Sequence, residues 1–105
     1  MKRIFVCSPF ASEDDALQAA NVERARAICR EIALAGHAPF APHLLLPQVL
    51  DDGVEAEREV GLRAGLAWLP VADELWVCGP GLSPGMVREI REAEQMGIRV
   101  RRQPE

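Results

Sequence analysis

Apolar and polar positions along the chain predict strands and helices in turn. Short apolar or alternating runs predict four strands, at residues 3–7, 38–41, 75–78 and 98–101. Longer segments with apolar residues at helical spacing predict three helices, at residues 12–36, 55–69 and 83–97. This alternation favours an α/β fold with a small doubly wound, flavodoxin/Rossmann-like parallel sheet of about four strands, in the order 2-1-3-4.

The first predicted helix and the strand after it carry local signals of their own. Ser12 is followed by three acidic residues, Glu13 to Asp15, which suit the positive end of a helix. Gly36 suits the C-terminal cap of this helix. One apolar face is predicted along this helix, formed by Val22, Ala25, Cys29 and Ile32. Pro39 interrupts the second strand and places it at an edge of the sheet.

The second predicted helix carries apolar residues on more than one side. Two stripes run along residues 55–69, one formed by Leu62, Leu66 and Leu69 and the other by Val60, Ala64 and Ala67. Such a helix is expected to be buried against the sheet and also against either a deeper part of the core or a neighbouring subunit. Residues 42–47 form an apolar loop that is expected to pack on a partner or to line a pocket. We therefore expect a homodimer or a higher homo-oligomer.

In a sheet of this order, ligands bind beyond the carboxyl ends of the strands where the order reverses. That point lies between the first and third strands, and the segments 8–10 and 79–85 would line it. Ser83 suits the N-cap of the next helix and Pro84 its first position. A small ligand is thus expected at this helix N-terminus, which can bind an anion.

Glu89 lies one position away from the predicted buried stripe of Met86, Ile90 and Ala93. Helical side chains lean toward the N-terminus, so Glu89 is expected over Gly85, where the missing side chain leaves an open space. The positive end of the helix is expected to keep the carboxylate ionised. Two interpretations remain open: a nucleophilic catalyst beside a gap, or a solvated flank residue.

Composition and charge narrow the function classes. The chain has 105 residues, which is enough for one domain. Its net charge is −4, its pI is near 5.2, and no basic block appears before Arg99. This charge pattern argues against a nucleic-acid polymer as partner. The apolar runs are too short for a membrane span, and the start shows no signal-peptide layout. Cys7, Cys29 and Cys78 lack metal-ligand spacing, so we expect a reduced cytoplasmic protein with no disulfide, metal or cofactor.

Three stretches of the chain, residues 5–10, 72–77 and 83–90, resemble the signature stretches of the nucleoside 2-deoxyribosyltransferase-like superfamily. This superfamily includes the 2'-deoxynucleoside 5'-monophosphate N-glycosidases, and residues 21–25 and 41–43 are similar to its small bacterial and phage members. The resemblance covers nearly the whole chain. It implies a nucleoside or nucleotide ligand and cleavage of an N-glycosidic bond.

The resemblance also implies roles for individual residues. The glutamate that matches Glu89 attacks the anomeric carbon, the base departs, and water or a second base resolves the covalent glycosyl-enzyme, as in retaining glycosidases. The implied substrate- or phosphate-binding residues are Ser8, Pro9, Phe10, Gly79, Ser83, Pro84, Gly85 and Met86.

The chain departs from the superfamily at one position. The enzymes carry an aspartate eight residues before the position of Asp73, and this chain has Gly65 there. Candidate replacements for the missing acid are Asp51, Asp52, Glu59 and His43. Two hypotheses follow: an N-glycosidase or deoxyribosyltransferase, or a non-catalytic nucleotide-binding module of the same fold.

Overall fold

The computed structural model describes residues 1–10 and 14–103. Its centre is a sheet of four parallel strands in the order β2-β1-β3-β4, as the sequence predicts. The strands are β1 (Arg3–Cys7), β2 (Ala38–Phe40), β3 (Glu74–Val77) and β4 (Arg99–Arg102). Pro39 lies in β2, which is an edge strand, so the expected position of this proline is confirmed.

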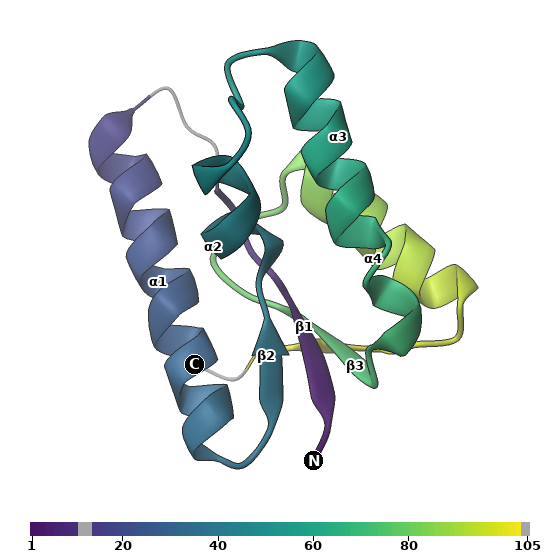
Figure 1. The fold of residues 1–105 in the computed structure, drawn as a ribbon. Coiled ribbons are helices and arrows are strands. Elements are labelled where there is room, and N and C mark those ends of the chain that lie inside the picture. The colour runs from purple at the N-terminus through teal and green to yellow at the C-terminus, as the bar shows by residue number, and fades with distance from the viewer. Residues whose placement is uncertain (11–13, 104–105) are drawn as a thin grey trace.

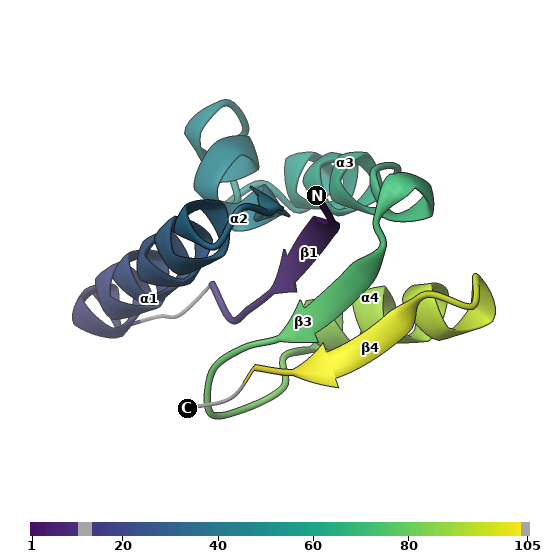
Figure 2. The same ribbon diagram turned by 90° about the horizontal axis from the view of Figure 1, so that it is seen from below.

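Helices cover both faces of the sheet, so it is doubly wound (Figures 1 and 2). The main helices are α1 (Asp15–Leu34), α3 (Glu55–Leu66) and α4 (Pro84–Gln95). One core lies between α1 and the β1 face that carries Ile4 and Val6. The other lies between α4 and the opposite β1 face, which carries Phe5 and Cys7. The chain therefore places α1 on one side of the sheet and α4 on the other.

Local sequence signals account for the start and the packing of α1. Asp14 is its N-cap, and the side chain accepts hydrogen bonds from the N–H groups of Ala16 and Leu17. The predicted start at Ser12 and Glu13 lies outside the described residues. The predicted apolar face is shifted, because the buried residues are Asn21, Ala25, Ile28 and Ile32. Val22 and Cys29 are only half-buried. Both sets have helical spacing, so periodicity alone does not choose between them.

The apolar segment at residues 42–47 is helical, which corrects the prediction of a loop. It forms α2 (Pro42–Leu45) and the 3-10 helix η1 (Leu46–Gln48). Pro42 and Pro47 lie in the first turns of these elements, where a missing N–H leaves no hydrogen bond unmade. The predicted proline-bounded loop is thus a pair of short helical turns.

Helix α3 is shorter than predicted, and the residues that it buries are glycines. It ends at Leu66, and the 3-10 turn η2 (Leu69–Val71) follows because Pro70 cannot continue an α-helix. Gly61 and Gly65 are its buried residues, and 54% of Val60 is exposed. The stripe of Leu62, Leu66 and Leu69 is partly buried, since Leu69 lies in the core and Leu66 packs against it. The stripe that begins at Val60 is not buried within the single chain. The predicted homo-oligomer stays a prediction.

Glu74, the first residue of β3, is the centre of a polar cluster at the β3–β4 side of the sheet. Its carboxylate accepts hydrogen bonds from Lys2 Nζ at 2.6 Å, from Trp76 Nε1 at 2.9 Å and from Arg101 Nη1 at 3.3 Å. The Arg101 guanidinium lies 5.5 Å from the centre of the Trp76 ring. The hydrogen bond from Lys2, followed by those from Trp76 and Arg101, lowers the pKa of Glu74 to about 2 against the opposing effect of burial.

Glu74→Gln is expected to destabilise the protein near neutral pH by about 1–2 kcal/mol, because charge-assisted hydrogen bonds are lost while Lys2 and Arg101 regain water. The lowered pKa means that this stabilisation is present above about pH 4.5 and fades as the pH falls toward 2. Urea unfolding at several pH values measures the difference. The exposed Glu94→Gln is the control, and a loss that is equal at every pH would contradict this expectation.

Candidate active site

The loops after β1 and β3 meet where the strand order reverses, as the sequence predicts. Gly79 follows β3 with a φ of +91°, a conformation that favours glycine. A Cβ atom at this position would lie 3.0 Å from Pro9 Cδ, so the glycine also permits the close approach of the two loops. Pro9 and Gly79 thus bring the loops together and are absent from the pocket lining.

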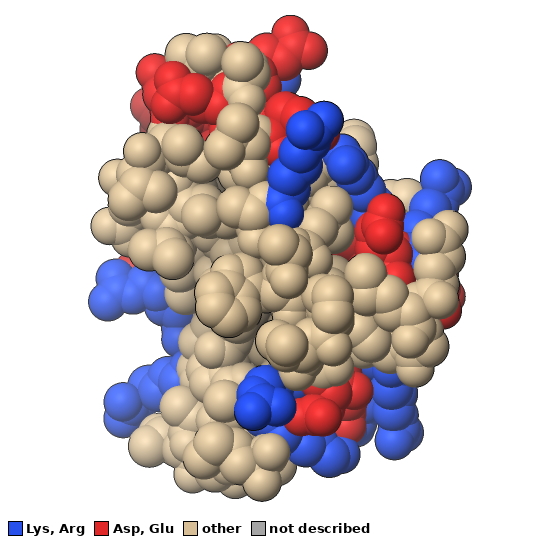
Figure 3. Space-filling view, turned by 45° about the vertical axis from the view of Figure 1, so that its right-hand side comes forward, with Lys and Arg blue, Asp and Glu red and all other residues tan. Residues whose placement is uncertain are grey.

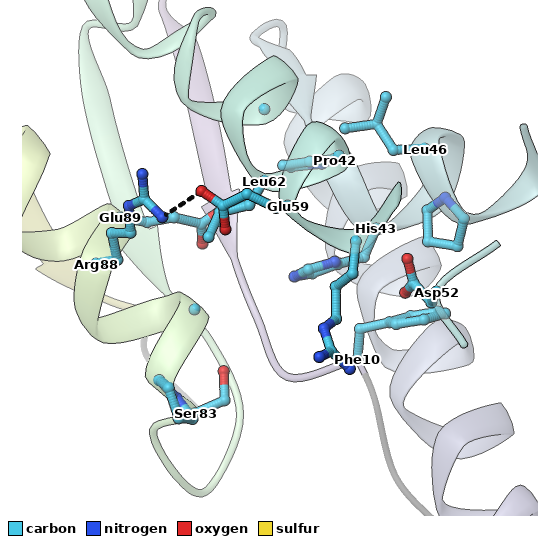
Figure 4. Close-up of a pocket in the computed structure, with 16 residues that line it drawn as sticks. Phe10, Pro42, His43, Leu46, Asp52, Glu59, Leu62, Ser83, Arg88 and Glu89 are labelled. Carbon is cyan, nitrogen blue, oxygen red and sulfur yellow. Dashed lines mark hydrogen bonds and ion pairs between the residues drawn. The ribbon is translucent and has the colours of Figure 1, made fainter. Parts of the chain in front are cut away.

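A pocket of about 580 Å³ opens between α2, α3 and α4. Phe10, Pro42, Leu46 and Leu62 supply apolar parts of its wall. Figure 4 shows Glu89, Glu59 and Arg88 on one side of the pocket, with His43, Asp52 and Phe10 on the other. Acidic side chains gather at the end of the molecule where α3 begins, and its first turn carries Glu55 and Glu57 (Figure 3).

Glu89 lines this pocket although only 2% of the residue is exposed. Its Oε1 atom is buried and has no hydrogen-bond partner among the described residues. Burial raises the pKa of Glu89 to about 7, and the nearby Cys7 thiol has a smaller, opposing effect. Glu89 is therefore not a solvated flank residue, and the expectation that its carboxylate stays fully ionised is corrected: it is a buried carboxyl group whose pKa is raised because burial removes its water.

The first turn of α4 has the predicted form. Ser83 is the N-cap, and its Oγ accepts a hydrogen bond from the Met86 N–H at 3.2 Å. Pro84 occupies the first helical position, and both residues line the pocket together with Gly85. A Cβ atom at Gly85 would have only Ser83 Oγ within reach, at 4.0 Å, so the predicted open space exists.

Ser8 and Met86 lie behind the pocket. Met86 is fully buried in the core and contributes backbone groups to the first turn of α4, so its predicted place in the binding surface is corrected. Ser8 is 1% exposed, and its Oγ has no hydrogen-bond partner in the described part of the chain. An unpartnered buried hydroxyl after a central strand is an available donor for a ligand.

The candidate acids differ in their surroundings. Glu59 accepts hydrogen bonds from Arg88 at 3.1 Å and from Arg63 at 3.3 Å, and the Arg88 bond is the main cause of its lowered pKa. The His43 ring stacks on Phe10, with ring centres 5.3 Å apart. Burial lowers the pKa of His43, and the charge of Asp52 acts in the opposite direction. Glu59 is thus held ionised, whereas His43 and Asp52 form a neighbouring pair.

Gly65 is the contact point between α3 and α2. A Cβ atom there would lie 3.1 Å from Pro42 Cβ and 3.3 Å from Pro42 Cγ. These distances are tighter than ordinary carbon contacts, so the helices approach closely because residue 65 has no side chain. The local packing therefore leaves little room for an acidic side chain at this position.

Gly65→Asp is expected to destabilise the protein by roughly 1–3 kcal/mol, because the new side chain meets Pro42 and places a carboxylate at a buried position. Gly81→Asp is the matched control, since a Cβ atom at Gly81 meets no atom within 4 Å. Thermal melts of both variants measure the difference. Equal melting temperatures of the two variants would contradict this expectation, because they would show that α2 and α3 move apart without loss of stability.

Two charged pocket residues and one supporting residue are absent from the predicted site residues. Arg58 and Arg88 line the pocket, and the helical spacing of Arg88 from Pro84 could have indicated it. Cys7, at the end of β1, donates its thiol to the Met86 backbone oxygen at 3.7 Å, and its place at the end of a central strand was the available signal. Asp73, in contrast, accepts the Arg3 N–H at 2.7 Å and supports the strands.

Within residues 1–10 and 14–103, no group of three or more His, Cys, Asp or Glu side chains is arranged to hold a metal ion. Cys7, Cys29 and Cys78 are free thiols in the structure, and the absence of a disulfide stays a prediction that mass spectrometry of the unreduced protein tests. None of the helices in the described part is both long and apolar enough to cross a membrane.

Comparison with known proteins places the chain in a family. A family model described as "Domain of unknown function (DUF7768)" matches residues 2–103. The chain belongs to this family. No curated protein matches its sequence.

One solved structure with a closely similar fold is a 2-deoxyribosyltransferase from the psychrotolerant bacterium Bacillus psychrosaccharolyticus, described as a biocatalyst for nucleoside synthesis. The TM-score is 0.68 at 22% sequence identity, and the match covers 95% of this chain and 70% of the other. This match shows that the two proteins share a fold.

Proposed function

We propose that this protein cleaves the N-glycosidic bond of a nucleoside or a nucleoside 5'-monophosphate, with Glu89 as the nucleophile. The observation that carries the proposal is the state of Glu89. It is a buried carboxyl group that lines a pocket of about 580 Å³, with one oxygen unpartnered among the described residues. A buried carboxylate without a hydrogen-bond partner destabilises the folded protein, so such a group is expected to contact a ligand or to take part in a reaction.

The proposed reaction has two steps. A Glu89 carboxylate oxygen attacks the anomeric carbon, and the carbon–nitrogen bond breaks with its electron pair passing to the base, which takes up a proton. Water then attacks the anomeric carbon of the glycosyl-enzyme and gives a proton back to the group that protonated the base, so that the free sugar leaves and the carboxylate is restored. A second base in place of water gives transfer. The first step needs the ionised form of Glu89, so base release is expected to increase as the pH rises through about 7.

His43 and Asp52 are the candidate sources of the proton for the leaving base, and the lowered pKa of His43 means that its protonated form decreases as the pH rises. Both line the pocket on the side opposite Glu89 (Figure 4). Glu59 is a poorer donor because Arg88 and Arg63 hold it ionised. The stacked Phe10 and His43 rings also give the base an aromatic surface.

The first turn of α4 would hold the sugar or its 5'-phosphate. Ser83, Pro84 and Gly85 line the pocket at the positive end of this helix. Arg58 adds a cation to the wall, and Ser8 supplies a buried hydroxyl behind it. These groups favour an anionic or strongly polar ligand at this end of the pocket.

The second candidate function is a non-catalytic nucleotide-binding module of the same fold. The observation that favours it is Gly65, which packs on Pro42 where the resembling enzymes carry an acid. This module would bind through Ser8, Ser83 and Gly85 and would release no base. Turnover therefore separates the two functions.

The test is incubation of the protein with a panel of nucleosides and their 5'-monophosphates, followed by chromatography for free base. Release of at least one base, with a preference between nucleoside and monophosphate, is expected. Binding measured by calorimetry without release from any member of the panel would favour the binding module.

A further inference from the structure

Asn21 is a buried polar residue of α1 that the proposed reaction does not use. Only 6% of the residue is exposed, and it shares the buried face of this helix with Ala25. Its side-chain Nδ2 donates to the Phe10 backbone oxygen at 3.2 Å, and its Oδ1 accepts from Arg24 Nη1 at 3.2 Å. Asparagine is a weak helix former and a buried amide needs hydrogen bonds, so these two contacts are the reason to expect it here. Asn21 therefore connects α1 to the segment that follows β1.

Phe10 is the residue that this hydrogen bond holds. It lies three residues beyond the end of β1 and outside the helices and strands, so sheet pairing does not fix its position. Phe10 lines the pocket, and its ring stacks on His43 with ring centres 5.3 Å apart and an angle of 14° between the planes. Figure 4 shows the two side chains together, across the pocket from Glu89. Asn21 thus fixes the backbone of a pocket residue from outside the pocket.

Arg24 extends the connection to the loop after β3. A Cβ atom at Gly79 would lie 3.5 Å from Arg24 Nη1 and 3.0 Å from Pro9 Cδ, so the guanidinium lies beside the contact between the two loops. Residues three apart on a helix are neighbours on its surface, which lets Asn21 and Arg24 act from the same side of α1. The pair joins this helix to both loops at the point where the strand order reverses.

We propose that Asn21 positions Phe10, so that the stacked rings of Phe10 and His43 present a fixed aromatic surface to the base of the ligand. This inference rests on the proposed function for its kinetic consequences. Asn21 does not itself line the pocket, so it is a positioning residue and makes no contact with the substrate. An aromatic ring that is already held in place costs less to order when a flat base stacks on it.

The test compares two Asn21 variants with Phe10→Leu and Ile32→Val. Asn21→Asp keeps the shape of the side chain and an acceptor for Arg24 but, once ionised, has no donor for the Phe10 backbone oxygen. Asn21→Ala removes both hydrogen bonds, and Phe10→Leu removes the ring itself. Ile32→Val is the matched control, because Ile32 is 3% exposed on the same face of α1, about three turns from Asn21, and loses one buried methylene group.

NMR signals of the histidine ring protons report the stack without any substrate. The chain has two histidines, and His37, whose Nδ1 accepts the Lys2 N–H at 3.1 Å, is an internal reference at the opposite end of β2 from the pocket. Spectra are recorded at pH 8, with His43→Gln used to assign the signals. Both Asn21 variants are expected to move the His43 signals toward their positions in Phe10→Leu, whereas Ile32→Val leaves them unchanged.

Turnover gives the kinetic counterpart of this comparison. Asn21→Asp is expected to lower kcat/KM about two- to tenfold, mainly through a higher KM, because the aromatic surface contacts the base before and during the reaction. The same change in a Phe10→Leu background should have almost no further effect, since Asn21 acts through the ring that is already absent.

His43 signals that stay at their wild-type positions in both Asn21 variants would overturn the inference, as would an equal displacement in Ile32→Val. A full further loss of kcat/KM when Asn21→Asp is added to Phe10→Leu would also overturn it. Asn21→Leu, which has a similar size and no polar group, replaces the two variants if thermal melts show that neither folds. If the wild type releases no base, the proposed function fails, but the NMR comparison still decides whether Asn21 holds Phe10.

Discussion

Glu89→Gln is expected to reduce base release by thousands-fold or more while the protein remains folded. The amide has nearly the shape of the carboxyl group but cannot form a stable bond to the anomeric carbon, so the covalent route is lost. Initial rates of base release, measured by chromatography at pH 8, give the ratio of wild type to variant. Ligand affinity should change little, because the residues at the first turn of α4 are untouched.

Arg58→Gln is a useful comparison for this loss, since it removes a pocket cation and leaves the nucleophile in place. It should mainly raise KM for a 5'-monophosphate, whereas Glu89→Gln should mainly lower kcat. Wild-type turnover in Glu89→Gln would show that another group attacks the sugar, or that water does so without a covalent intermediate.

The same variant is expected to be more stable than the wild type above neutral pH, by roughly 2–3 kcal/mol. Burial raises the pKa of Glu89 to about 7 from 4.5, so the folded protein holds a proton that the unfolded chain releases. Between these two values, the free energy of unfolding of the wild type therefore decreases with rising pH, and it stays low above 7. A neutral glutamine removes this contribution.

Urea unfolding of wild type and Glu89→Gln at pH 4 and pH 8 measures this effect. The two proteins should have similar stability at pH 4, and the variant should be the more stable one at pH 8. Glu92→Gln, on the same helix, is the control and should show no such divergence. Equal stability of wild type and Glu89→Gln at pH 8 would mean that the carboxylate is well solvated in the folded protein.

The sequence predicts the architecture well because its signals are local. Pro84 and Ser83 define the start of α4, and Pro39 marks the edge strand, so the order of elements and their parallel pairing follow from residue patterns. The helical turns at residues 42–48 were missed because their prolines resemble loop signals until their positions within each turn are known.

The candidate site was predictable in its position but less so in its electrostatics. Glu89 and Gly85 could be placed at the crevice from helical spacing. The environment of Glu89 includes residues that are far away in the sequence, among them those of α2 and α3 that line the same pocket. No local pattern contains such contacts, so the pKa of a group in the first turns of α4 could not be obtained from that helix alone.

The central claim is that Glu89 becomes covalently bonded to the sugar. A 2'-deoxy-2'-fluoro analogue of the best substrate should trap this bond, because fluorine slows the second step by destabilising the oxocarbenium-like transition state. Mass spectrometry of the acid-quenched, digested protein is expected to find the fluorosugar on the peptide that contains Glu89, and no adduct in Glu89→Gln. An adduct on a different residue, or release of the analogue's base with an unmodified Glu89 peptide throughout, would contradict the account.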